Sequence, residues 1–90
     1  MFDLKGKNAL ITGASGGIGG EIARQLHAQG AAVAISGTRT APLEELAAEL
    51  GERAYVTPCN LSDADEVDEL PKRAIKAMGS VDILVNNAGL

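Results

Sequence analysis

Short hydrophobic runs alternate with amphipathic stretches along the whole chain. Four runs are largely apolar, at 8–12, 31–35, 54–57 and 81–85. Each has the length of a strand, and nearly continuous apolar character is typical of strands that are buried on both faces of a sheet. The pattern therefore predicts four buried strands.

Between these runs, hydrophobic residues recur at the three- and four-residue spacing of helices. Three helices are predicted, ending at Gly30, Gly51 and Gly79. The positions expected to face the core are Ile18, Ile22, Ala23 and Leu26, then Leu43, Leu46, Ala47 and Leu50, then Val67, Leu70, Ala74 and Met78. Pro71 should kink or split the third helix, because proline removes a backbone donor and clashes with the preceding turn.

The second and third helices also carry start signals. Thr40 can cap the second helix, with Pro42 in its first turn, where the missing N–H does no harm. Ser62 or Asp63 can cap the third helix, and Asp63 with Glu66 fits a capping box.

The predicted order is β-α-β-α-β-α-β, with no linker or repeat that would divide residues 1–90. Strands joined by helices form parallel sheets with right-handed crossovers, covered by helices on both faces. The sequence therefore predicts one α/β unit, built on a parallel sheet with helices on both faces.

Composition narrows the classes of function. A net charge of −4 argues against a nucleic-acid binder that neutralises phosphates. No apolar run approaches the roughly 18–20 residues that span a bilayer, and the N-terminus lacks the pattern of a signal peptide, so a cytoplasmic protein without a membrane partner is expected. Cys59 is the one cysteine, which excludes an internal disulfide and a cysteine-cluster zinc site. His27 is the one histidine, so a histidine-based metal site is not expected either. Nine acids between residues 44 and 69 are interpreted as solvated helix faces, with an acidic docking face as the alternative.

A glycine-rich turn, Thr12-Gly13-Ala14-Ser15-Gly16-Gly17-Ile18-Gly19, joins the first strand to the first helix. A diphosphate needs backbone N–H groups, a helix N-terminus and no Cβ in the way. Gly13 lets the chain turn, Gly17 lets backbone approach the phosphates and Gly19 lets the helix pack closely, while Ser15 can donate a hydroxyl. This context predicts a dinucleotide site, with a purely structural turn as the alternative. No Gly-Lys-Ser/Thr follows, so a P-loop is not indicated.

The end of the second strand bears on the choice of nicotinamide cofactor. An acidic residue there would bind the adenosine ribose and repel a 2′-phosphate, but none occurs between residues 22 and 42. Arg39 presents a planar cation suited to phosphate, and Ser36 and Thr38 can donate hydroxyl hydrogen bonds. NADP(H) is therefore favoured over NAD(H), with a surface role for Arg39, paired with Glu44 or solvent, as the alternative.

The glycine spacing, together with Asn86-Asn87-Ala88-Gly89 after the fourth strand, resembles the short-chain dehydrogenase/reductases. The Gly37-Thr38-Arg39 turn and the Asn60-Leu61 pair look most like 3-oxoacyl-[acyl-carrier-protein] reductases of type II fatty-acid synthesis. The likeness covers the whole chain but only about the N-terminal third of a family member. The resemblance therefore implies a truncated piece, the N-terminal part of a Rossmann-type doubly wound parallel sheet.

The resemblance also implies roles for residues outside the glycine turn. The Asn60-Leu61 position would contact the adenine ring, and the segment from Asn86 would line the adenosine ribose; simple turns are the alternatives. Similar reductases often carry Arg at the position of Gly16, so Arg39 would hold the phosphate more alone here. The residues assigned to the cofactor are Gly13, Ser15, Gly16, Gly17, Ile18, Gly19, Ser36, Thr38, Arg39, Asn60, Leu61, Asn86, Ala88 and Gly89.

For the complete protein, the resemblance implies NADPH-dependent reduction of a 3-oxoacyl-[acyl-carrier-protein] to the 3-hydroxyacyl form. The family's Ser, Tyr and Lys would lie beyond Leu90; Tyr55 has no Lys four residues later, so no catalytic residue is assigned. Acyl-carrier protein is the expected partner and a homo-tetramer the expected assembly. The isolated chain should aggregate through its fourth strand, which becomes an unpaired edge. The alternatives are a standalone NADP-binding half-domain, a reductase of another carbonyl or alcohol, and a structural fragment that binds nothing well.

Overall fold

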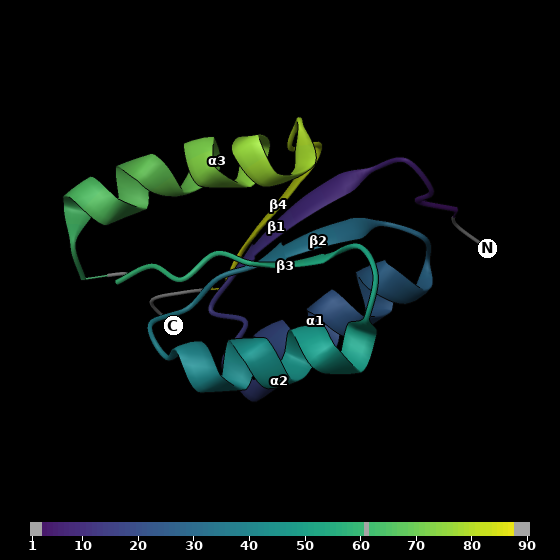
Figure 1. The fold of residues 1–90 in the computed structure, drawn as a ribbon, viewed down its shortest axis with the longest axis horizontal. Helices are drawn as coiled ribbons and strands as arrows, with labels where there is room; N and C mark the ends of the chain where they lie inside the picture. The colour runs from purple at the N-terminus through teal and green to yellow at the C-terminus, as the bar shows by residue number, and fades with distance from the viewer. Residues whose placement is uncertain (1–2, 61, 88–90) are drawn as a thin grey trace.

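A computed structural model describes residues 3–60 and 62–87. Within them, strands and helices alternate as β1 (Asn8–Thr12), α1 (Gly17–Ala28), β2 (Ala32–Ile35), α2 (Thr40–Leu50), β3 (Ala54–Val56), α3 (Ala64–Met78) and β4 (Ile83–Asn86). The strands form one parallel sheet in the order β3-β2-β1-β4. Helices α1 and α2 cover one face and α3 covers the other (Figure 1). The predicted α/β fold class and element order are confirmed.

The core divides into two clusters, one on each face of the sheet. Toward α1 and α2 lie Ala9, Ile11, Val33 and Ile35, packed with Ala14, Ala23, Leu43 and Leu46. Toward α3 lie Leu10 and Ala34, packed with Cys59, Leu70 and Ala74. Successive strand residues point to opposite faces, so a strand covered on both sides needs apolar residues at every position. This explains the continuous apolar runs of β1 and β2.

The start of α2 differs from the prediction. The helix begins at Thr40 itself, with Arg39 at the cap position in an extended conformation (φ −96°, ψ 117°) and no side-chain cap. The expectation that Thr40 caps this helix was wrong, because Thr40 is already helical. Pro42 lies in the first turn, as expected.

Asp63 caps α3, but the capping box is incomplete. Its carboxylate accepts hydrogen bonds from the backbone N–H groups of Asp65 and Glu66, at 2.9 and 3.4 Å. The carboxylate of Glu66 accepts from the N–H of Asn60 at 3.2 Å, whereas the N–H of Asp63 donates to the Asn60 carbonyl. Glu66 therefore stabilises the loop before the helix, and it does not accept the hydrogen bond from the N–H of Asp63 that a capping box requires.

Helix α3 runs unbroken through Pro71, so of the two predicted effects the split is wrong, and a kink at Pro71 stays a prediction. Pro71 lies on the exposed side of the helix, where water can solvate the carbonyl that proline leaves without a donor. Two residues expected to face the core are exposed: Ile18, at 69%, and Val67, at 40%. Both lie in the first turn of their helices, at the edge where the strands give way to loops.

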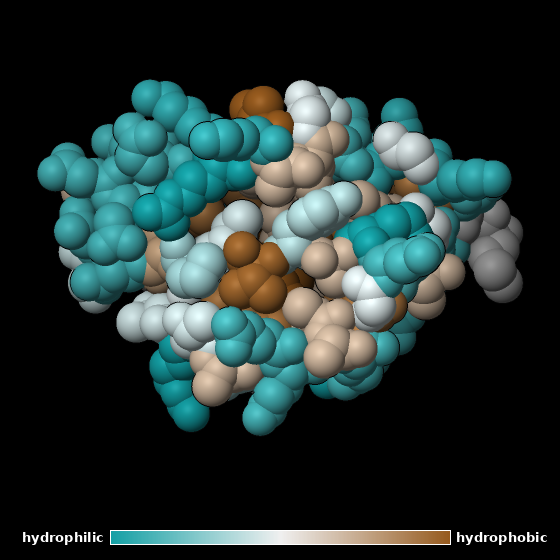
Figure 2. Space-filling model, viewed as in Figure 1, coloured by the Kyte–Doolittle hydropathy of each residue, from teal (hydrophilic) through white to brown (hydrophobic). Residues whose placement is uncertain are grey.

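On the face drawn in Figure 2, hydrophilic side chains cover α3 and α2, and hydrophobic atoms show between these layers, where β3 runs. Strand β3 pairs only with β2 among the described residues and forms one edge of the sheet. No helix in the described ranges is long and apolar enough to cross a membrane.

Candidate functional site

The glycine turn leaves β1 at Gly13, whose φ of +68° lies in the left-handed region that favours glycine. Gly19 is required by packing: a Cβ there would lie 2.8 Å from the carbonyl carbon of Gly13, nearer still to its oxygen, and 3.0 Å from Cα of Ala14. A Cβ at Gly17 would meet no atom within 4 Å. The fold therefore needs Gly19, whereas the space beside Gly17 is open to a ligand.

The N-terminus of α1 is uncapped. Gly16 occupies the cap position, no side chain bonds to the helix start, and the first turn holds no acidic residue. The N–H groups of Gly17, Ile18 and Gly19 find no acceptor among residues 3–60 and 62–87. Free amides at the positive end of a helix dipole suit an anion, and the binding of a diphosphate at this turn stays a prediction.

The end of β2 supports this turn. The N–H of Ala14 donates to the Ser36 carbonyl at 2.8 Å, and the N–H of Ser36 donates to the Ile11 carbonyl at 2.9 Å. A Cβ at Gly37 would lie 2.7 Å from Oγ of Ser15, so Gly37 makes room for that side chain. The glycine turn and the turn that follows β2 therefore lie side by side.

Ser36 contacts the glycine turn through its backbone, while its side chain is fully buried. Its Oγ has no hydrogen-bond partner among the described residues. A buried hydroxyl without a partner costs about 1–3 kcal/mol, and a bound polar ligand or a water would remove that cost. An unpaired polar atom next to the turn fits a dinucleotide site.

Thr38 and Arg39 are both exposed just after Ser36 and Gly37. Within the described ranges, the Arg39 guanidinium forms no ion pair with Glu44 or with another carboxylate. The guanidinium is therefore available to a phosphate, and the alternative of a pair with Glu44 is not observed.

The carboxyl ends of β1 and β4 meet through Thr12. Its Oγ1 lies 3.1 Å from Oδ1 of Asn86 and 3.3 Å from the Val85 carbonyl, and it accepts from the N–H of Asn87 at 3.0 Å. Strand order reverses between β1 and β4, which is where open α/β sheets bind ligands. The structure thus brings Asn86 to the edge that carries the glycine turn. Ala88 and Gly89 lie outside the described residues.

Asn60 adopts the Asx-type turn that was the alternative to an adenine contact. Its Oδ1 accepts from the N–H of Ser62 at 3.0 Å. This leaves the amide Nδ2 without a partner among the described residues, so contact with a base through that nitrogen stays a prediction. Leu61 lies outside the described residues.

Cys59 is buried and packs in the cluster under α3. Burial raises the pKa of its thiol, and the nearby carboxylate of Glu66 raises that pKa further. A thiol with a raised pKa is a poor nucleophile, because the thiolate is the reactive form. The structure agrees with its interpretation as a packing residue.

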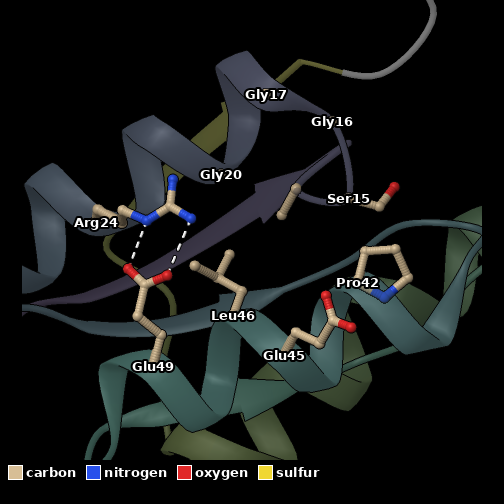
Figure 3. A pocket seen from close by; sticks show the side chains of 10 residues that line it. Ser15, Gly16, Gly17, Gly20, Arg24, Pro42, Glu45, Leu46 and Glu49 are labelled. Carbon is tan, nitrogen blue, oxygen red and sulfur yellow. Dashed lines mark hydrogen bonds and ion pairs between the residues drawn. The ribbon is translucent and has the colours of Figure 1, made fainter.

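A pocket of about 250 Å³ lies between α1 and α2, directly beside the glycine turn (Figure 3). Besides Ser15, Gly16 and Gly17, it is lined by Arg24, Glu45 and Glu49, which sequence reasoning did not assign. Arg24 and Glu49 are 25 positions apart, and only the packing of the two helices joins them.

Comparison with known proteins agrees with this geometry. A family model described as short chain dehydrogenase matches residues 7–90. Nodulation protein G of Rhizobium sp. (strain N33) is 60% identical over 90 residues, which cover 100% of this chain and 37% of that protein. The 3-oxoacyl-[acyl-carrier-protein] reductase FabG of Rickettsia bellii (strain RML369-C) is 47% identical, with 100% of this chain and 36% of that protein covered.

Two solved structures share the fold. The 3-ketoacyl-(acyl-carrier-protein) reductase of Brucella melitensis, complexed with NADH, superposes with a TM-score of 0.86 at 38% identity, covering 91% of this chain and 34% of that one. A short chain dehydrogenase of Mycobacterium smegmatis superposes with a TM-score of 0.91 at 36% identity, covering 100% of this chain and 41% of that one. The chain spans little more than a third of the length of the curated relatives it matches.

Proposed function

Because the chain belongs to the short chain dehydrogenase family, a family of oxidoreductases that use a nicotinamide dinucleotide, we propose that it forms the NADP(H)-binding part of a longer reductase. The uncapped start of α1, with its three free amides, is the observation that carries this proposal. These amides and the open space beside Gly17 hold the diphosphate, and Ser15 adds a hydroxyl.

The preference for NADP(H) rests on the end of β2. No carboxylate lies there to bind the ribose and repel a phosphate. The exposed guanidinium of Arg39, with the Thr38 hydroxyl beside it, offers a charged and a neutral donor to the adenosine 2′-phosphate. In this proposal Asn86, whose Oδ1 lies 3.1 Å from Oγ1 of Thr12, lines the adenosine ribose.

The proposed reaction is reduction of a 3-oxoacyl-[acyl-carrier-protein] to its 3-hydroxyacyl form. When bound, the cofactor supplies hydride to the substrate carbonyl, while protein groups orient it and provide the proton. In this proposal the Ser, Tyr and Lys of the family lie beyond residue 90. The acyl-carrier protein as partner, the homo-tetramer and the cytoplasmic location belong to the same proposal for the complete protein.

A second substrate class has specific support. The two nodulation protein G relatives are 60% and 58% identical, above the 47% and 48% of the first two 3-oxoacyl-[acyl-carrier-protein] reductases. The second candidate function for the complete protein is therefore that of a short-chain reductase that acts on another carbonyl or alcohol. Sequencing the coding DNA past Leu90 tests the proposal that this chain is part of a longer reductase. The family's Ser and Tyr-x-x-x-Lys are expected downstream, whereas a stop codon would favour a standalone half-domain. Assaying the complete protein with acetoacetyl-[acyl-carrier-protein] then separates the two substrate classes.

The cofactor is tested with Arg39→Ala, titrated with NADPH and NADH in the protein expressed from its complete reading frame. Loss of a charged hydrogen-bonding partner weakens NADPH binding by about 1.5–3 kcal/mol, or about 10- to 150-fold, with little change for NADH. Lys76→Ala, which removes one exposed cation on α3, is the matched control. Equal losses of affinity for both cofactors in Arg39→Ala would refute NADP(H) recognition. If the wild-type protein bound neither cofactor, the glycine turn would have only a structural role.

A further inference from the structure

Asn60 lies in the loop between β3 and α3, and hydrogen bonds within that segment hold it in place. Its backbone N–H donates to Oε1 of Glu66 at 3.2 Å, and its carbonyl accepts from the N–H of Asp63 at 2.9 Å. Its side-chain Oδ1 accepts from the N–H of Ser62 at 3.0 Å. The Asn60 side chain is therefore fixed at its oxygen end, although the residue is exposed.

These bonds decide which end of the Asn60 amide is left for a ligand. Only the oxygen of an amide can accept from an N–H, so the bond from Ser62 fixes the orientation of the planar group. Nδ2, on the other side of that plane, has no hydrogen-bond partner within residues 3–60 and 62–87. Asn60 therefore presents a hydrogen-bond donor to a ligand that approaches it.

The loop of Asn60 lies beside the turn that follows β2. The N–H of Cys59 donates to the Gly37 carbonyl at 3.1 Å. Gly37 also lies against the glycine turn, because a Cβ there would be 2.7 Å from Oγ of Ser15. The glycine turn, the end of β2 and the loop of Asn60 therefore follow one another along the carboxyl edge of the sheet, in the order β1, β2, β3 (Figure 1).

This order matches the order of groups along the cofactor. In the proposed function, on which the inference rests, the glycine turn holds the diphosphate, and Thr38 and Arg39 hold the 2′-phosphate. The adenosine ribose carries its base on the carbon next to the one that carries this phosphate. Neighbouring strands lie about 4.8 Å apart, so a cofactor held in this way brings its base to the next strand end, where Asn60 lies.

We propose that Asn60 is a specificity-determining residue that recognises the base of the cofactor as a hydrogen-bond acceptor. Adenine offers an acceptor at N7 and a donor at its 6-amino group, whereas a 6-oxopurine offers acceptors at both N7 and O6. Nδ2 can donate to either kind of base, while Oδ1 already accepts from Ser62. The site therefore does not select adenine over hypoxanthine.

The test compares the dissociation constants of NADPH and of its analogue in which hypoxanthine replaces adenine, in the protein expressed from its complete reading frame. The two ligands have the same charge, so the ratio of their constants is insensitive to charges added to the protein. For wild type the two constants should differ by less than about twofold, the effect of a weak hydrogen bond.

Asn60→Asp keeps an oxygen for the N–H of Ser62 and exchanges the donor for an acceptor. The new carboxylate accepts from the 6-amino group of adenine and repels O6 of hypoxanthine. The ratio should therefore rise at least about tenfold in favour of adenine, as for a hydrogen bond to a charged group. Gln29→Glu makes the same exchange at the end of α1 away from the glycine turn, and should leave the ratio unchanged.

Two results would overturn the inference and leave the proposed function intact, because NADPH is still bound in both. A wild-type preference for NADPH of more than about twofold would mean that Oδ1 accepts a second hydrogen bond, from the 6-amino group. A ratio that does not rise in Asn60→Asp would mean that the base lies elsewhere. If the wild type bound neither ligand, the proposed function itself would fail, and the inference with it.

Discussion

Replacing Gly19 with alanine tests how tightly α1 packs on the glycine turn. The added Cβ would lie 2.8 Å from the carbonyl carbon of Gly13 and 3.0 Å from Cα of Ala14. All the neighbouring atoms belong to the backbone, so no side chain can rotate away. Either the turn or the helix must shift, and both changes disturb the free amides at the start of α1.

The cost follows from this geometry. Overpacking of a close-packed site costs about 1–3 kcal/mol. A 90-residue domain has a free energy of unfolding of only about 5–14 kcal/mol, so the loss is a substantial fraction of it. For a domain of this size, each kcal/mol lowers Tm by about 4–8 °C, which predicts a fall of about 4–24 °C for Gly19→Ala.

Gly17→Ala provides the contrasting variant, because its Cβ meets nothing within 4 Å and lies in the same helical turn. Its Tm should stay the same or rise slightly, since alanine is the better helix former. Its affinity for NADPH should fall at least about tenfold, because the methyl group keeps the phosphates from a charge-assisted hydrogen bond to the backbone. Thermal melts followed by circular dichroism, with cofactor titration by fluorescence, measure both quantities.

The opposite pattern would refute this reasoning. A Gly19→Ala protein with unchanged Tm would mean that the turn yields easily. A Gly17→Ala protein that binds NADPH like wild type would mean that the open space beside Gly17 is not where the diphosphate lies.

Three further outcomes follow from other parts of the fold. Asp63→Ala should lower stability by about 1 kcal/mol in urea unfolding, because two N–H groups of α3 lose their acceptor; an unchanged midpoint would show that water replaces the cap. Arg24 lowers the pKa of Glu49 below its ordinary 4.5, so the stabilisation is present above about pH 4.5 and is lost as the pH falls through the lowered pKa. Thermal melts should therefore show Glu49→Gln less stable than wild type at pH 7 and equal to it in acid, whereas a constant difference would contradict the linkage. The isolated 90-residue chain should associate in light scattering, because β4 is an edge of the described sheet and Leu84 is 62% exposed; Leu84→Lys should reduce this association, and a stable wild-type monomer would contradict it.

Strand patterning predicted the fold well because the chemistry is local and repeated. Strands buried on both faces must be apolar at every position, so β1 and β2 stand out without knowledge of their partners. The start of α2 is harder, because it depends on which residue keeps an extended backbone. That residue is Arg39, and no side-chain cap marks it.

The same distinction applies to the site. The glycine turn is one continuous segment, so its requirements can be inferred from spacing alone. The pair of Arg24 with Glu49 depends on how α1 lies against α2, which no local pattern records. The burial of Ser36 also depends on the whole fold, because neighbouring segments cover the end of β2.

The position of β1 in the middle of the sheet sets an order of assembly during synthesis. Asn8 pairs with Ala32, 24 positions along the chain, whereas Ala9 pairs with Ile83, 74 positions along. At about 5–20 residues per second, the ribosome makes the intervening 50 residues in about 2.5–10 s. One edge of β1 is therefore complete for seconds before its other partner exists. The N–H of Asn87 can reach Oγ1 of Thr12 only after β4 has been made. Until then the nascent chain exposes the edge of β1 that later joins the glycine turn to the segment at the end of β4.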